Sequence, residues 1–274
     1  MFRPPSKTRE NARLFSGTVG TILLPPVTPI TSQCVVQSVW VGDSLSFLET
    51  LSIKSFLANG HEFHLYLYGS CAGVPEGTII KDANEIMPKS RIPAYRCLQI
   101  FSDEFRYRLL QMRESWWVDV DVICLRPFDF VEPYVFASEI ITDCPPYPNN
   151  YMLVNQCVLH APSDSEFLRR AVDFCESKDP MTFRGYWGGE VGMGPELVTD
   201  LTLELGLMEY VQPRDVFAPI RCQRTPDDFL NPALNLDLRK TYAIHGFQSQ
   251  WRDKKNGAYH SSCLYEQLKT RYHA

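Results

Sequence analysis

The sequence predicts an α/β protein with a mostly parallel central sheet that helices cover on both faces. Segments rich in β-branched residues alternate with segments whose apolar residues recur at helical spacing. Several strand candidates are continuous apolar runs, which is typical of strands buried on both faces. With 274 residues, 45% of them apolar, the chain can bury one large core. We therefore expect a single domain at residues 34–274, preceded by an extended, proline-containing arm at residues 1–33.

The first expected strand is the β-branched run at residues 34–42, and a helix with a closing Asn-Gly pair follows at residues 43–60. Ser102 is the expected N-cap of a second helix at residues 101–115, because Phe105 and later apolar residues share one helical face. The other expected strands lie at 63–68, 116–125, 134–140, 155–161 and 241–247, with a short strand that leads into a turn at 78–88. The other expected helices lie at 163–177 and 194–206. Ligands of such sheets bind beyond the carboxyl ends of the strands.

Two aspartates interrupt the apolar run "WWVDVDVICL" at residues 116–125. Residues two apart in a strand point to the same side, so Asp119 and Asp121 can converge on one cation. A buried carboxylate without a partner is costly, so the pair requires a metal, an arginine or solvent. A hard divalent cation such as Mn²⁺ or Mg²⁺, completed by phosphate oxygens, suits two carboxylates. The alternative is that the strand ends at Val118 and that water solvates both acids at its tip.

Charge and composition indicate which binding partners and which cellular environment to expect. The formal net charge of -5 and the interspersed signs give no basic stripe, so nucleic acid is not an expected partner. The apolar stretch near the N-terminus is short and interrupted by prolines, so we expect no membrane span and a soluble, cytoplasmic protein. The nine cysteines are scattered singly without a Cys-x-x-Cys pair, and we expect them to be reduced and structural.

The stretch "FSDEFRYRLLQMRESWWVDVDVICLRPFD" resembles the central signature of glycosyltransferase family 32 and its relatives, which include the glucosylating domains of the large clostridial toxins. Further blocks, "VPEGTIIKDANEIMP", "NQCVLHAPSDSEFLRRAVDF", "GPELVTD" and "AIHGFQSQW", extend the resemblance over most of the chain. The resemblance implies a catalytic domain of the GT-A fold with a mixed, mostly parallel sheet. It also implies a metal-dependent, retaining transfer of a hexose from a nucleotide-sugar, with UDP as the nucleotide, to a glycan or other hydroxyl acceptor.

The resemblance also assigns roles to residues near the acid pair. Trp40 is similar to a family tryptophan that packs against the nucleotide base, although a strand tryptophan is more often plain core. Asp103 and Arg106 match the helix motif that contacts the donor sugar and phosphate; their three-residue spacing also fits an ordinary helix salt bridge. By the same resemblance Asp119 reaches the ribose and the metal, and Asp121 is the more direct metal ligand.

Four further positions carry roles by resemblance. His245 matches a ligand of the metal or diphosphate, and imidazole suits Mn²⁺ better than Mg²⁺. Trp251 matches a tryptophan that closes over the leaving diphosphate. Asn155 and Gln156 occupy the place where relatives contact the transferred sugar, although such amides commonly satisfy loop backbone. Relatives carry Ser-Trp directly, whereas here Ser249 is separated from the tryptophan by one residue, so its role at the metal is open.

Other functions fit parts of the pattern. A haloacid-dehalogenase-like phosphatase also carries Asp-x-Asp after an apolar strand, but it needs a later acidic pair, and the only Gly-Asp here, at Gly42, precedes the motif. A non-catalytic nucleotide-sugar-binding protein would keep the same fold. The glycine-rich turn around Glu190 is either a closing loop or a solvated surface turn. No carboxylate is convincingly placed as a covalent nucleophile, so front-face transfer with retention, which the family resemblance implies, fits better than a double displacement.

Overall fold

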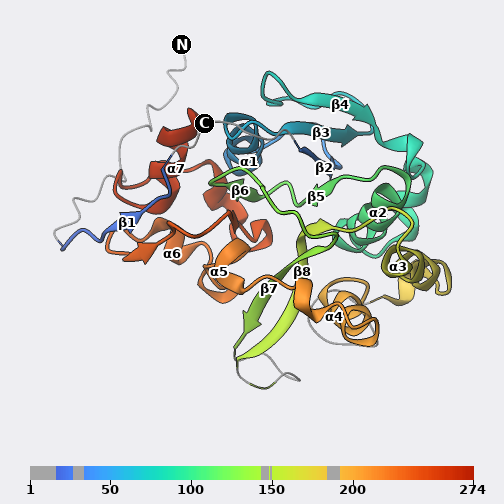
Figure 1. Ribbon diagram of the computed structural model, residues 1–274. Coiled ribbons are helices and arrows are strands. Elements are labelled where there is room, and N and C mark those ends of the chain that lie inside the picture. The colour runs from blue at the N-terminus through green and yellow to red at the C-terminus, as the bar shows by residue number, and fades with distance from the viewer. Residues whose placement is uncertain (1–16, 27–33, 143–147, 149, 184–191) are drawn as a thin grey trace, which may run out of the picture.

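The computed structural model describes residues 17–26, 34–142, 148, 150–183 and 192–274. Its centre is a six-stranded mixed sheet in the order β4-β3-β2-β5-β8-β7, and only β8 runs against the other five strands (Figure 1). The strands are β2 (Val35–Trp40), β3 (Glu62–Leu67), β4 (Ile79–Asp82), β5 (Trp116–Val118), β7 (Val135–Ile141) and β8 (Tyr151–His160). The predicted α/β class with a mixed, mostly parallel central sheet is confirmed.

Helices cover both faces of this sheet. The helices of the described part of the chain are α1 (Phe47–Ala58), α2 (Leu98–Met112), α3 (Glu166–Glu176), α4 (Pro195–Glu204), α5 (Arg214–Phe217), α6 (Asp227–Leu230) and α7 (Leu264–Tyr272). Because alternate strand residues face opposite sides, Trp117 packs with α2, α3 and α4 in one buried cluster, whereas Trp116 packs with α1 in another. Short 3-10 helices lie at Ala83–Glu85, Lys89–Ala94, Pro180–Thr182, Met208–Tyr210, Cys222–Arg224, Gln248–Gln250 and Arg252–Asn256.

Two small sheets complete the fold. β6 (Val122–Cys124) pairs antiparallel with β10 (Ala243–His245), and β1 (Ile22–Leu23) pairs parallel with β9 (Leu236–Asp237). A third buried cluster joins α1, β6, β10 and α7 around the fully buried Trp251. The C-terminal helix α7, red in Figure 1, therefore packs beside α1.

The predicted single strand at residues 116–125 is wrong. β5 ends at Val118, β6 begins at Val122, and the two strands belong to different sheets. The reason is that β6 leaves the central sheet to pair with β10, more than a hundred residues later. The predicted N-cap at Ser102 is also wrong, because α2 begins at Leu98 and Ser102 lies inside it. Phe101 shares the buried face of this helix with Phe105, so its apolar stripe extends one turn further toward the N-terminus.

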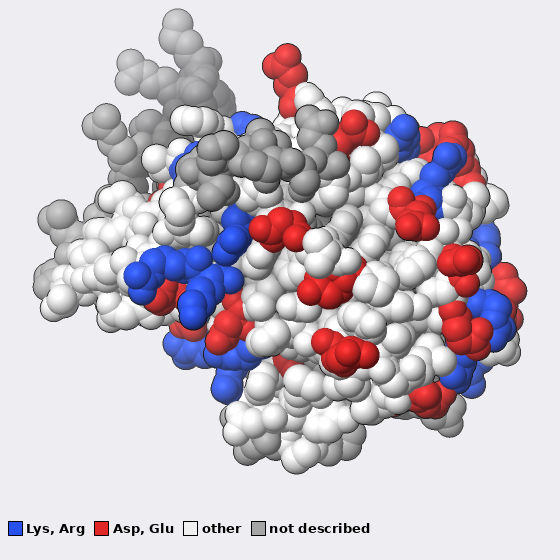
Figure 2. All heavy atoms as spheres, in the orientation of Figure 1, with Lys and Arg blue, Asp and Glu red and all other residues white. Residues whose placement is uncertain are grey.

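The cysteines at positions 34, 71, 97, 124, 157, 175 and 263 are free thiols, and Cys144 lies outside the described residues. Within the described ranges, no helix combines the length and the apolar character needed to cross a bilayer. Figure 2 shows acidic and basic side chains interspersed on the face it presents, in keeping with the modest net charge of -5. The turn around Glu190 lies outside the described residues.

Candidate active site

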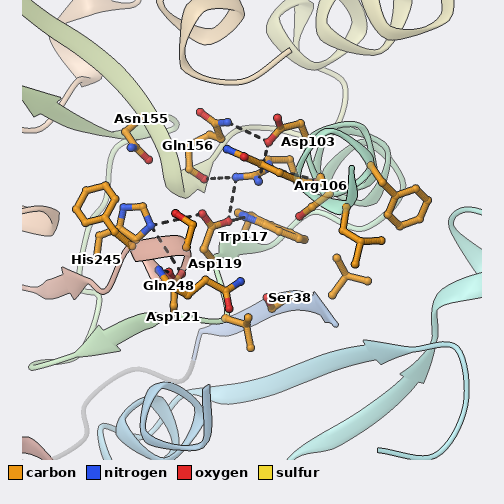
Figure 3. Close-up of a pocket in the computed structure, with 18 of the residues that line it drawn as sticks. Ser38, Asp103, Arg106, Trp117, Asp119, Asp121, Asn155, Gln156, His245 and Gln248 are labelled. Carbon is orange, nitrogen blue, oxygen red and sulfur yellow. Dashed lines mark hydrogen bonds and ion pairs between the residues drawn. The ribbon is translucent and has the colours of Figure 1, made fainter. Parts of the chain in front are cut away.

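A cavity of about 1030 Å³ opens beside the carboxyl ends of β2 and β5 (Figure 3). Trp40, the last residue of β2, and Asp119, the first residue after β5, both line it. Side chains from α2, β8 and the segment after β10 form most of the rest of the described wall, and Arg96, Pro195 and Cys222 also line it. This volume is at the upper end of the range for small-molecule and cofactor sites. The cavity lies where ligands bind in sheets of this class.

The two aspartates of the apolar run occupy a tight turn between β5 and β6. The Asp119 carbonyl accepts a hydrogen bond from the Val122 amide at 2.9 Å, and the Asp119 amide donates to the Cys157 carbonyl of β8 at 2.8 Å. On the far side of the turn, Ser52 of α1 donates its hydroxyl to the Val122 carbonyl at 2.5 Å. The turn is therefore fixed by the central sheet at one end and by α1 at the other.

Each carboxylate of the turn has one oxygen held by a protein donor. Asp119 Oδ1 accepts from Trp117 Nε1 at 2.8 Å and from the Arg106 guanidinium at 3.0 Å. Asp121 Oδ2 accepts from the backbone amide of Gln248 at 2.6 Å. Asp119 is partly open to the cavity, whereas Asp121 is only 3% exposed. The alternative prediction was that the strand ends at Val118 and that water solvates both acids. The strand does end at Val118, but Asp121 is buried.

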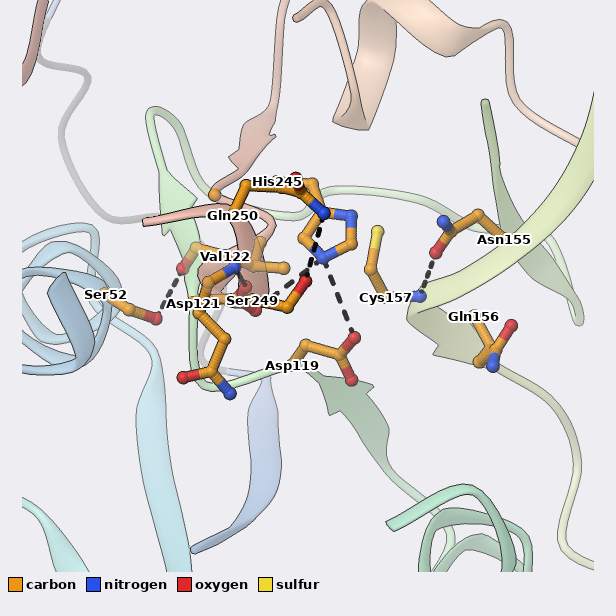
Figure 4. A network of polar contacts seen from close by, with 12 residues as sticks. Ser52, Asp119, Asp121, Val122, Asn155, Gln156, Cys157, His245, Ser249 and Gln250 are labelled. Atoms are coloured by element: carbon orange, nitrogen blue, oxygen red, sulfur yellow. Dashed lines mark hydrogen bonds and ion pairs between the residues drawn. The ribbon is translucent and has the colours of Figure 1, made fainter. Parts of the chain in front are cut away.

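The remaining carboxylate oxygens face one histidine ring (Figure 4). His245 Nε2 lies 3.8 Å from Asp119 Oδ2 and 3.7 Å from Asp121 Oδ1, and the three groups offer ligand atoms that all lie within 4.8 Å of one another. Burial raises the pKa of Asp121, the His245 side chain lowers it and the Asp119 charge raises it again, with a net rise. Two oxygens and one imidazole nitrogen form a donor set that suits Mn²⁺. The structure thus brings the three predicted metal ligands together.

Arg106 is a buried cation beside this turn. Its guanidinium contacts Asp103 at 2.9 Å, donates to the Gln156 carbonyl at 2.9 Å and lies 4.9 Å above the ring of Trp117. Burial works against the charge of Arg106, but Asp119 and Asp103 more than offset it and hold its pKa above the ordinary value. Burial raises the pKa of Asp103 to about 6, although Arg106 and Gln156 act in the opposite direction. The predicted Asp103–Arg106 pair is therefore a buried ion pair at the cavity wall.

The side-chain amides of Asn155 and Gln156 in β8 differ in how many of their atoms have a hydrogen-bond partner in the protein. Asn155 donates to Glu139 at 2.7 Å and accepts from the Cys157 amide at 2.7 Å, so its amide has protein partners on both atoms. Gln156 donates to Asp103 at 3.1 Å, but its buried Oε1 has no hydrogen-bond partner among the described residues. Both side chains line the cavity. Gln156 is therefore the better placed of the two to accept a hydrogen bond from a bound molecule.

The two tryptophans that the resemblance singled out lie in different surroundings. Trp40 is partly exposed, lines the cavity and donates its indole N–H to the Ser44 carbonyl at 3.1 Å. Trp251 is fully buried in the third core cluster, where it donates to the Gly246 carbonyl at 2.6 Å and packs 4.7 Å from Tyr265. It is not among the described residues that line the cavity. The structure thus brings all the predicted site residues to the cavity except Trp251.

Among the cavity residues that were not singled out from the sequence, three contact the groups of the acid turn or His245. Trp117 orients Asp119 and underlies Arg106, and Gln248 holds Asp121 through its backbone amide. Phe247 has a left-handed backbone at φ 47° and places its ring 3.9 Å from that of His245.

Trp117 could have been predicted from the sequence, because in a strand its side chain points to the same side as that of Asp119, two residues later. The contact from Gln248 could not have been predicted, because it is made by the backbone amide and does not depend on the residue type. Ser249 also lines the cavity.

No protein-family model matches the chain, and no curated protein sequence matches it. Among solved structures, the chain is similar to PaToxG glycosyltransferase, with 14% identity and a TM-score of 0.41 over 65% of this chain and 75% of that one. It is similar to an active-site mutant of LgtC, with 12% identity and a TM-score of 0.39 over 61% and 69%. It is also similar to GlyE of Streptococcus pneumoniae TIGR4, with 12% identity and a TM-score of 0.37 over 68% and 46%.

Proposed function

We propose that the protein is a metal-dependent, retaining glycosyltransferase that moves a hexose from a UDP-sugar to a glycan or other hydroxyl acceptor. One observation carries the proposal: Asp119, Asp121 and His245 turn their free ligand atoms toward one point at the wall of a cavity of about 1030 Å³. A buried arginine lies directly beside that point. A cavity of this size that offers a cation site and cationic charge suits a nucleoside diphosphate with an attached sugar. The sequence resemblance supports the same class of donor.

Asp121, Asp119 and His245 would hold the metal, which we expect to be Mn²⁺ or Mg²⁺. Their chemistry fits such an ion, because the second oxygen of each carboxylate is already held by Gln248 or by Trp117 and Arg106. The first oxygens are thereby turned toward His245 rather than toward protein donors. When bound, the ion would supply positive charge for the leaving diphosphate.

The chain's own residues would bind and orient the donor. Trp40, exposed at the end of β2, offers an aromatic face for the nucleotide base. The Arg106 guanidinium is already engaged by two carboxylates, so its part is to fix Asp103 and Asp119 and to maintain positive charge beside the diphosphate. Gln156 Oε1, buried and without a partner among the described residues, is suited to accept a hydrogen bond from a sugar hydroxyl. Asp103 lies 3.1 Å from the same amide and would act with it.

The proposal of retention is supported by the state of the cavity's acids. The carboxylates among the described lining residues are Asp103, Asp119 and Asp121. Asp103 is bound by Arg106 and Gln156, and the other two face the metal position. A double displacement would need a further carboxylate that is free to attack the sugar carbon. Front-face transfer, in which the acceptor approaches from the side of the leaving diphosphate, needs none.

The test measures release of sugar from UDP-hexoses with and without Mn²⁺. We expect Mn²⁺-dependent turnover that Asp121→Asn lowers about 100-fold or more, which corresponds to roughly 2.7 kcal/mol of transition-state stabilisation. Asp237→Asn, which changes an exposed aspartate paired with Arg239, is the matched control and should keep full activity. Turnover that does not depend on the metal, or that survives in Asp121→Asn, would reject the site. Donor binding without any turnover would indicate a non-catalytic binding protein instead.

A further inference from the structure

Helix α1 supports both segments that form the candidate metal site. On one side, Ser52 donates to the Val122 carbonyl at 2.5 Å and Ser55 accepts from the Cys124 amide at 2.8 Å, so the helix is tied to β6 directly after the acid turn. On the other side, the first turn of α1 carries Glu49, whose side chain is almost fully buried. The helix thus forms a common base for the turn with Asp121 and for the segment that follows β10.

A charged side chain connects Glu49 to that second segment. Lys255 Nζ lies 2.6 Å from Glu49 Oε1 and donates to Gln248 Oε1 at 2.8 Å. The backbone amide of the same Gln248 donates to Asp121 Oδ2 at 2.6 Å. The backbone of Lys255 is fixed in turn, because the buried Tyr265 donates its hydroxyl to the Lys255 carbonyl at 2.6 Å. A continuous polar path therefore runs from α1 through Lys255 and Gln248 to the carboxylate of Asp121.

The segment at residues 246–248 has a conformation that needs such an anchor. Phe247 adopts φ 47° and ψ 58°, a left-handed conformation that is unfavourable for a residue with a side chain. Such residues persist where the surroundings over-determine them. At Gly246 the backbone approaches the acid turn so closely that a Cβ would lie 2.6 Å from the Asp121 carbonyl. In this conformation the Gly246 amide donates to the Asp121 carbonyl at 2.9 Å and the Gln248 amide donates to Asp121 Oδ2 at 2.6 Å.

We propose that Lys255 is a positioning residue of the candidate metal site. By holding Gln248 against α1, it keeps the Gln248 amide on Asp121 Oδ2 and so turns Asp121 Oδ1 toward His245. Lys255 itself does not line the cavity and would not touch the donor. The inference rests on the proposed function, since it concerns the metal that this function requires.

The test measures Mn²⁺ affinity by isothermal titration calorimetry, without donor or acceptor. Lys255→Met keeps most of the packing of the stem and removes both hydrogen bonds, and we expect roughly 10-fold weaker binding, as for other groups that orient metal ligands. Lys255→Arg should restore most of the affinity. Lys254→Met, which removes a neighbouring lysine in an exposed contact of 3.4 Å with Asp227, is the matched control and should bind like the wild type.

A second pair of measurements separates positioning from the effect of an unpaired buried charge. The double variant Glu49→Gln with Lys255→Met removes the Glu49 carboxylate that Lys255→Met alone would leave unpaired, and Gln can still cap α1. We expect this variant to bind Mn²⁺ as weakly as Lys255→Met and to exchange the Gln248 amide hydrogen at least about 10-fold faster than the wild type without metal. Wild-type affinity and exchange in Lys255→Met or in the double variant would overturn the inference. Wild-type protein that binds no Mn²⁺ would instead contradict the proposed function.

Discussion

Trp117→Phe tests whether the indole orients Asp119 or merely fills the core. Trp117 is almost fully buried, and its Nε1 donates to Asp119 Oδ1 at 2.8 Å. Its ring also lies 4.9 Å below the Arg106 guanidinium. Phenylalanine retains an aromatic ring at this place but has no N–H. The substitution therefore removes one of the two donors on Asp119 Oδ1 and leaves the other, the guanidinium, in position.

The expected size of the effect follows from these contacts. A hydrogen bond to a charged group contributes about 1.5–3 kcal/mol, and the part of Asp119 that water reaches reduces the loss. We expect about 1 kcal/mol, which is roughly a 5-fold loss in Mn²⁺ affinity and in kcat/KM for the donor. The smaller ring also leaves a cavity under the sheet, which should lower the free energy of unfolding by about 1–2 kcal/mol.

The matched control is Trp116→Phe, the same change one residue earlier. Trp116 is buried on the opposite face, where it stacks on His160 at 4.8 Å and packs against Phe128. The described donors to the Asp119 carboxylate are Trp117 and Arg106, so Trp116→Phe leaves both in place. It should lose similar stability but retain Mn²⁺ affinity. Calorimetric titration of Mn²⁺ and donor turnover, each beside a urea unfolding curve, distinguish the two variants. Equal effects of both substitutions on Mn²⁺ affinity, or none from Trp117→Phe, would refute the orienting role.

Two further predictions concern stability. Burial lowers the pKa of His61 to about 4, so the unfolded chain protonates first and stability present above pH 6.5 is lost as the pH falls toward 4. Between pH 7.5 and 5 we expect about 2 kcal/mol of this loss in urea unfolding, and His61→Phe should lack it; the same pH slope in both proteins would contradict the assignment. Trp251→Phe should lower the free energy of unfolding by about 2 kcal/mol, because it removes buried volume and the donor to Gly246. Unchanged stability with reduced turnover would instead favour contact with the diphosphate.

Hydrophobic periodicity predicted most strands of the central sheet and the helices packed on it, because each of these elements carries its own local pattern of apolar residues. The run at residues 34–42 contains β2, the segment at 43–60 contains α1, and the alternation of such units predicted the mostly parallel sheet. The boundary of α2 was less well predicted. Ser102 has the residue type of a cap, but the apolar stripe through Phe101 continues past it and burial of that stripe decides where the helix begins.

The sequence left the break after β5 open as an alternative but could not decide for it, because the residues around it continue an apolar pattern. What separates β5 from β6 is the pairing of Ile123 with Ile244, a contact between segments that are far apart in the chain. The position of Trp251 has the same origin. Its core surroundings come from α6 and α7, so its resemblance to a diphosphate-covering tryptophan carried no information about its burial.

Asp119 and Asp121 were predicted to converge because residues two apart in a strand point to the same side. In the structure they converge because both lie in the turn between β5 and β6, and their surroundings differ. Asp119 has an arginine at 3.0 Å, but the described groups that face Asp121 are a backbone amide, the imidazole of His245 and like charges. A carboxylate that is only 3% exposed and lacks a permanent cation is costly, and a divalent ion would offset that cost. On the proposed function, this asymmetry would make Asp121 the residue whose burial depends most on a bound metal, and the Gln248 amide the contact that orients it.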